Sequence, residues 1–185
     1  VYSKLVEAGI EDEAEITVIP VAGTFTAGPF EIELISMTHS IPEPASLLIR
    51  TACGTVFHSG DWKFDPEPLV GPHYDKKRLQ ALADEDILAM ISDSTNVMST
   101  SESGSEASVR NGLIDVIAKC TGRVAVTCFA SNVARVESVM KAAEICGRRV
   151  VLLGRSMHRI YAAARENGYL KTVAPLLSED EFSYM

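Results

Sequence analysis

The strongest constraint on the fold of this 185-residue chain is a change in its hydrophobic pattern near residue 97. Before that point, short β-branched and aliphatic runs are separated by Gly and Pro turn signals, as in a β-rich structure. The pattern predicts strands at Ile16–Pro20, Phe30–Met37, Ser46–Thr51, Thr55–His58 and Ile87–Ser92, with a hairpin over Leu47–His58. Residues 1–97 are therefore expected to form one β-rich half.

After a Ser- and Gly-rich stretch at Ser99–Ser105, helix and strand signals alternate regularly. The pattern predicts helices at Ser105–Cys120, Ser131–Cys146 and Ser156–Asn167, with Ser105 as an N-cap and glycines ending the last two, and buried strands at Arg123–Phe129 and Arg149–Leu153. Apolar strands between helices are typical of a parallel sheet with right-handed crossovers. We therefore expect an α/β fold class with domains at 1–97 and 98–185 and no sheet running through both.

Charge is distributed unevenly along the chain. Residues 1–118 carry 7 basic and 19 acidic side chains, whereas residues 119–171 carry 10 basic and 3 acidic ones. A polyanion would therefore be held by the basic segment 119–171. The alternative is that these charges only solvate helix surfaces.

Sequence features of targeting and redox chemistry favour a cytoplasmic protein. No apolar run approaches the roughly 18–20 residues that span a bilayer, and no signal peptide follows Val1, so we expect a soluble protein with no membrane partner. The absence of an initiator Met indicates a fragment. The four cysteines form no CxxC pair and are expected to be buried free thiols, with zinc or disulfide use as the alternative.

Polar clusters directly follow three of the predicted strands, at Thr38–Pro42, His58–Asp65 and Ser92–Asn96. Loops at strand ends are where α/β proteins usually place function. An imidazole and a carboxylate at neighbouring strand ends suit Zn²⁺ or Mn²⁺. Taken singly, each cluster also fits a plain structural role as a loop histidine or a turn aspartate.

Six motifs occur along the chain in a fixed order: His39-Ser40-Ile41-Pro42, Thr55 to Pro66, Ser92 to Asn96, Gly104-Ser105-Glu106, Phe129 to Val133 and Gly154 to Met157. Together they resemble the metallo-β-lactamase-fold nucleases with a β-CASP insert, and among these the bacterial ribonuclease J-like proteins. The resemblance implies that residues 1–97 are part of a metallo-β-lactamase αβ/βα sandwich and residues 98–185 part of a β-CASP-type parallel α/β unit. It implies a metal-dependent hydrolase that cleaves RNA.

The resemblance also assigns roles around a metal centre. It implies that His39 is a metal ligand, that Asp61 is a catalytic ligand bridging two metal ions, and that Asp93 is a catalytic acidic residue close to them. Lys63 and Asp65 would have support roles. The metals would be two Zn²⁺ ions, or Mn²⁺, and would activate water for attack on a phosphodiester.

A further set of residues is implied to face RNA. Ser131, Asn132 and Arg135 match a helix start in the family, and a helix N-terminus attracts phosphate. N-capping alone is the alternative for this segment. The resemblance leaves a homo-oligomer open for the longer protein.

Two departures from the family pattern affect the expected activity. The family's His-x-His-x-Asp-His metal motif and its remaining β-CASP histidines do not occur in this sequence. We therefore expect these 185 residues to be an internal fragment that binds no stoichiometric metal and does not cleave RNA by itself. A hydrolase of a small substrate and a metal-free RNA-binding scaffold remain as alternative functions.

Overall fold

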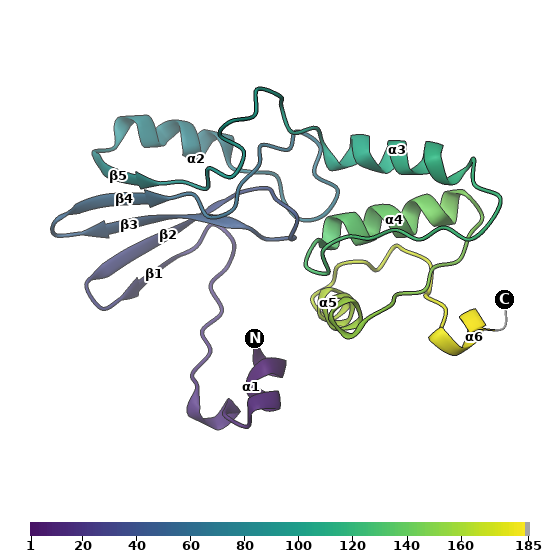
Figure 1. Ribbon diagram of the computed structural model, residues 1–185. Coiled ribbons are helices and arrows are strands. Elements are labelled where there is room, and N and C mark those ends of the chain that lie inside the picture. Colours follow the sequence, from purple (N-terminus) through teal and green to yellow (C-terminus); the bar gives the residue numbers. More distant parts are fainter. Residues whose placement is uncertain (184–185) are drawn as a thin grey trace.

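The computed structural model describes residues 1–183 and divides them into a sheet half and a helical half (Figure 1). Five strands form one sheet in the order β1 to β5: β1 (Thr24–Ala27), β2 (Phe30–Ser36), β3 (Ala45–Thr51), β4 (Gly54–His58) and β5 (Ile87–Ile91). The first four strands pair antiparallel, whereas β4 and β5 pair parallel. A parallel pair needs a long crossover, and this one contains helix α2 (Lys76–Ala81) and the 3-10 turn η2 (Leu82–Asp84).

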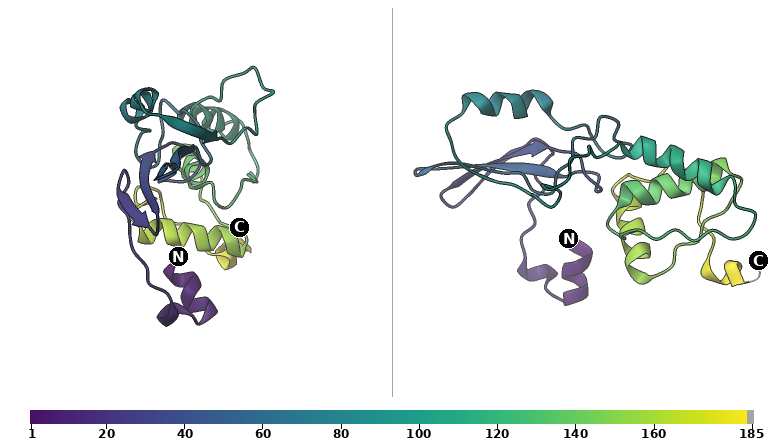
Figure 2. Two further views of the ribbon diagram at one scale, coloured as in Figure 1. Left: turned by 90° about the vertical axis from the view of Figure 1, so that its left-hand side faces the viewer. Right: turned by 45° about the horizontal axis from the view of Figure 1, so that its top comes forward.

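The sheet is held by a small core beneath α2. Ile35, Leu48 and Phe57 come from three neighbouring strands and are buried on one face. Leu79 of α2 and Leu82 of η2 pack against them, so the helix covers this face of the sheet (Figure 2). The predicted strands at Phe30–Met37, Ser46–Thr51, Thr55–His58 and Ile87–Ser92 are confirmed to within a few residues, and so is the hairpin over Leu47–His58.

The strand predicted at Ile16–Pro20 is wrong. Its Val18 side chain is exposed, and Pro20 has no N–H to give to a ladder. The hairpin partner of β2 is instead β1, because the two-residue Gly28-Pro29 turn pairs Ala27 with Phe30. Helix α1 (Tyr2–Ala8) and the 3-10 turn η1 (Glu11–Glu13) precede this segment.

The helical half contains α3 (Glu106–Ile117), α4 (Val133–Ile145), α5 (Arg155–Glu166) and α6 (Glu179–Ser183). Its core combines one face of α4 with residues of α5 and of the segments that follow each helix: Val133, Val136, Met140, Leu152, Ala164, Leu170 and Val173. The N-cap prediction is confirmed, since the Ser105 hydroxyl accepts from the Ser108 amide at 3.0 Å.

The α/β class is confirmed, but the strands predicted at Arg123–Phe129 and Arg149–Leu153 do not form. Within residues 1–183 the sheet ends at β5, and neither run has a ladder partner. A parallel strand requires neighbours to satisfy its backbone, and two such runs cannot make a sheet alone. Phe129 is largely exposed as a result, while Leu152 is buried in the helical core. The last two residues of the domain predicted at 98–185 lie outside the described residues.

Candidate functional site

Three loops leave the sheet at the same edge. Strands β2 and β4 each pair antiparallel with β3 and so run in the same direction, and β5 runs parallel to β4. The carboxyl ends of these three strands therefore meet at one edge. His39, Asp61 and Asp93 each follow within three residues of a strand end, so all three lie in the loops at that edge.

The loop after β2 presents an exposed imidazole on a fixed base. His39 is exposed, but Thr38 before it is buried and forms an isolated antiparallel bridge with Lys63. The Ser40 hydroxyl oxygen, Oγ, lies 3.0 Å from His39 Nδ1, which is within hydrogen-bonding distance. This contact occupies one ring nitrogen and leaves Nε2 as the nitrogen available to a ligand.

The loop after β4 is shaped by a turn at Gly60. The Gly60 amide donates to His58 Nδ1 at 3.0 Å, and its φ of 61° lies in the left-handed region that glycine adopts without strain. Buried Ser59 anchors the turn, because its carbonyl accepts from the Ser46 hydroxyl at 2.7 Å. Asp61 directly follows this turn, and its side chain is exposed.

The loop after β5 fixes the carboxylate of Asp93. Its Oδ1 accepts from the Thr95 amide at 3.0 Å and from the Thr95 hydroxyl at 2.5 Å. These two hydrogen bonds, with a smaller contribution from the nearby charge of His39, hold the pKa of Asp93 below its ordinary value. The backbone of Asp93 is held as well, by the Ser59 hydroxyl at 3.0 Å and the Trp62 indole at 3.1 Å. Trp62 is a residue for which sequence reasoning assigned no role.

The Thr38–Lys63 bridge therefore joins the loops after β2 and β4, and side-chain hydrogen bonds from Ser59 and Trp62 to the Asp93 backbone join the loops after β4 and β5. Within residues 1–183, no hydrogen bond or ion pair links His39 directly to Asp61. Their proximity as a ligand pair stays a prediction.

The residues predicted to face RNA lie at the start of α4, and two of them form hydrogen bonds within the protein. The Asn132 side chain caps α4 by accepting from the Arg135 amide at 2.9 Å. The Arg135 guanidinium binds both carboxylate oxygens of buried Glu106, at 3.0 and 3.3 Å. Ser131 is exposed. The capping alternative is thus realised at Asn132, and Arg135 is engaged within the protein.

Other arginines of the basic segment also have intramolecular partners. Arg148 donates to the carbonyls of Cys120 and Gly122, which fixes the chain after α3. Arg149 and Arg159 form ion pairs with acidic side chains, but both arginine side chains are more than half exposed. Exposed ion pairs are worth about 0–1 kcal/mol, so these two side chains can exchange partners readily.

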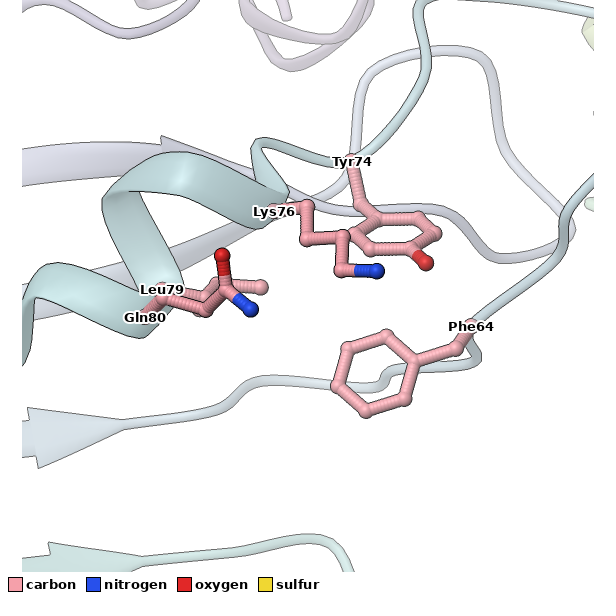
Figure 3. A pocket seen from close by; sticks show the side chains of 5 residues that line it. All are labelled: Phe64, Tyr74, Lys76, Leu79 and Gln80. Atoms are coloured by element: carbon pink, nitrogen blue, oxygen red, sulfur yellow. The ribbon is translucent and has the colours of Figure 1, made fainter.

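An aromatic pocket lies beside the loop after β4. It is a hollow of about 300 Å³ lined by Phe64, Tyr74, Lys76, Leu79 and Gln80. Figure 3 shows the Phe64 ring, the Tyr74 ring and the Lys76 chain converging on this hollow. Phe64 also contacts the Trp62 ring, with centroids 5.0 Å apart. None of the residues predicted as metal ligands lines this pocket.

The donor set does not by itself fit a complete metal centre. A catalytic zinc site uses about three protein ligands. In the part of the chain that the structure describes, no group of three or more His, Cys, Asp or Glu side chains is arranged to hold a metal ion. The predicted ligands His39 and Asp61 belong to no such group there.

No helix within residues 1–183 combines the length and the apolar character needed to cross a membrane.

Two comparisons with known proteins find similarity to ribonuclease J. A family model described as "Ribonuclease J, beta-CASP domain" matches residues 121–185. Ribonuclease J of Sinorhizobium meliloti is 46% identical over 173 residues, which make up 94% of this chain and 31% of that protein. Ribonuclease J of Thermus thermophilus is 40% identical over 152 residues, or 82% of this chain and 26% of that protein.

A solved structure supports the fold alone. The crystal structure of a protein of unknown function from Enterococcus faecalis V583 matches with a TM-score of 0.57 at 15% identity, over 90% of this chain and 42% of that one. The chain spans about a third or less of the curated relatives named above. By these similarities and by the order of its motifs, the chain is ribonuclease J-like, and residues 121–185 match the β-CASP domain of ribonuclease J.

Proposed function

We propose that this chain is part of a metal-dependent hydrolase that processes RNA by cleaving phosphodiester bonds. The observation that carries the proposal is the convergence of three loops with His39, Asp61 and Asp93, in a sequence 46% identical over 173 residues to a protein named ribonuclease J. Residues 1–97 are proposed to be part of a metallo-β-lactamase domain and residues 98–185 part of a β-CASP domain.

The division of charge supports RNA as the partner. The segment 119–171 carries 10 basic and 3 acidic residues, and its helix α4 begins beside the loop that holds His39. The exposed guanidinium groups of Arg149 and Arg159 can trade their surface carboxylates for phosphates. Binding of this kind weakens as salt concentration rises, because condensed cations are released from the nucleic acid.

The proposed metal is Zn²⁺, two ions per site, with Mn²⁺ as the alternative. His39 and Asp61 are proposed as ligands, and the other ligands are proposed to come from outside these 185 residues. All four cysteines are free thiols, which supports a reducing compartment such as the cytoplasm. The expected burial is wrong, since Cys53 is exposed and the other three are only partly buried. Homo-oligomer formation by the longer protein belongs to the same proposal.

The test is RNA cleavage by a longer protein that carries this sequence. H39A and D61N are each expected to reduce cleavage of a single-stranded RNA by at least about 10²-fold, since metal ligands rarely tolerate replacement. The matched control is D84N, which changes an exposed aspartate on η2, away from the three loops.

Equal activity in D61N and D84N would contradict the proposal. Hydrolysis of a β-lactam or thioester with no action on RNA would favour the small-substrate alternative. RNA binding without cleavage, in the presence of Zn²⁺ or Mn²⁺, would favour a scaffold.

A further inference from the structure

We propose that Asp65 is a positioning residue that couples the loop carrying His39 to helices α3 and α4, and so sets where bound RNA lies relative to that loop. The catalytic consequence rests on the proposed function. The coupling itself rests on a closed ring of contacts that begins and ends at the residues flanking His39.

The carboxylate of Asp65 is the first link in this ring. Asp65 is 4% exposed, and its Oδ2 accepts from the Glu106 amide, at the first residue of α3, at 2.8 Å. Its Oδ1 accepts from the Glu67 amide at 2.9 Å, and the Lys63 ammonium lies 3.2 Å away. A buried charge this well paired, at the positive end of a helix dipole, is a stable joint between a loop and a helix.

The backbone of Asp65 forms the second link, towards His39. Its amide donates to the Thr38 hydroxyl at 3.1 Å. The Thr38 hydroxyl donates in turn to the Lys63 carbonyl, while the Lys63 amide donates to the Thr38 carbonyl at 2.9 Å. Thr38 directly precedes His39, so a displacement of Asp65 is transmitted to the base of the imidazole.

Helix α4 closes the ring from the other side. Buried Glu106 binds Arg135 of α4 through both carboxylate oxygens. The Ala134 amide of α4 donates to the Ser40 carbonyl at 3.2 Å. Ser40 directly follows His39, so the helix proposed to lie against RNA is bonded on one side to the His39 loop and on the other to Asp65 through Glu106.

Burial of Asp65 alone would raise its pKa. The amide hydrogen bonds from Glu106 and Glu67, together with Lys63, outweigh burial and hold the pKa below its ordinary value. The carboxylate therefore stays ionised as a hydrogen-bond acceptor at neutral pH. Replacing it with Ala leaves the first amide of α3 without its acceptor and releases the loop from the helix.

The test compares D65A with D75A in a longer protein that carries this sequence. Asp75 is a matched control, because it also caps a helix, accepting from the Arg78 amide at 2.9 Å, but its helix α2 belongs to the sheet half. D65A is expected to speed hydrogen exchange at the Glu106 and Ala134 amides. D75A is expected to leave both exchange rates unchanged.

Kinetics on single-stranded RNA separate positioning from general destabilisation. D65A is expected to lower kcat by about 10²-fold, the size of effect that a misplacement of about 1 Å produces, while the RNA Kd changes by less than about threefold. D65N retains one oxygen acceptor and is expected to recover part of kcat. D75A should match the unaltered protein in both constants.

Two results would overturn the inference: unchanged exchange at Ala134 in both D65A and D65N, or a kcat for D65A equal to that of D75A. If D65A does not fold, D65N carries the comparison. If the unaltered protein does not cleave RNA, the proposed function fails, and the exchange rates still decide whether Asp65 couples the two halves.

Discussion

At the scale of single residues, Asp93 shows how hydrogen bonds fix the position of a loop carboxylate. Both of its Thr95 hydrogen bonds reach the same oxygen, Oδ1. The backbone on either side is fixed by Ser59 and Trp62, which come from the loop after β4. Asp93 is therefore oriented by its own loop and by the loop of Asp61 together.

The replacement T95V tests this arrangement. Losing the hydroxyl, the first cause of the lowered pKa, is expected to raise the pKa of Asp93 toward its ordinary value of about 3.9. Carboxyl carbon NMR over a pH titration measures the change. The control is T51V, whose hydroxyl contacts only the β3–β4 turn. An Asp93 titration midpoint that does not move in T95V would mean that the backbone amide and His39 alone determine the pKa.

At the scale of elements, a network of charges ties α2 and η2 to the sheet. The Arg78 guanidinium contacts Glu33 of β2 and Glu85 after η2, and Arg50 of β3 contacts the same two carboxylates. All four side chains are less than a third exposed. The network lies where α2 meets the sheet and thus supports the hydrophobic contacts of Leu79.

This network predicts a stability that depends on pH. The Arg78 hydrogen bonds are the first cause of the lowered pKa of Glu33 and of Glu85. A lowered folded-state pKa gives stability that is present above the unfolded value of about 4.3 and is lost as the pH falls through the folded value. R78M is therefore expected to reduce the free energy of unfolding at neutral pH by roughly 1–3 kcal/mol and to flatten its acid dependence.

Urea unfolding of R78M at a series of pH values measures both effects. The control is K4M, which removes the surface ion pair between Lys4 and Glu7, whose side chains are 60% and 55% exposed. A decline in stability below pH ~4 that is as steep in R78M as in the unaltered chain would contradict the role of the network.

The sequence predicts those helices and strands whose signals lie within a few neighbouring residues. Short aliphatic runs bounded by turn residues suffice for β2 to β5, and the N-cap residue Ser105 indicates the start of α3. The same signals failed at Arg123–Phe129, because an apolar run becomes a parallel strand only where neighbouring strands supply its hydrogen bonds. Helix α2, at six residues, is too short for its periodicity to stand out.

At the scale of the whole molecule, the two halves meet through loops rather than through a shared sheet (Figure 1). The Tyr169 hydroxyl donates to Glu43 at 2.6 Å across 126 residues of sequence, and partly buried Val70 packs against the helical core. Gly71 lies so close to Pro42 that a β-carbon there would overlap the Pro42 carbonyl. The loop with His39 is thus contacted by both halves of the molecule.

Motif order predicted three candidate loops, and the structure places their three candidate residues at one sheet edge. Sequence could not predict the ring through Asp65, because Glu106 lies 41 residues from it and meets Arg135 a further 29 residues on. No periodicity connects such positions. The use of Arg135 as a partner of Glu106 escaped prediction for the same reason, since an isolated arginine in a basic segment gives no sign of its partner.

We propose that these 185 residues hold part of a metal centre, to which His39 and Asp61 contribute. The most direct measurement is metal analysis of the 185-residue chain after dialysis against Zn²⁺ and Mn²⁺, beside a longer protein that carries the same sequence. We expect less than stoichiometric metal on the 185-residue chain, about two ions per longer protein, and a loss of bound metal in its H39A and D61N variants. One or more tightly bound ions on the 185-residue chain, held by His39 and Asp61, would contradict this proposal, and so would unchanged metal content in both variants of the longer protein.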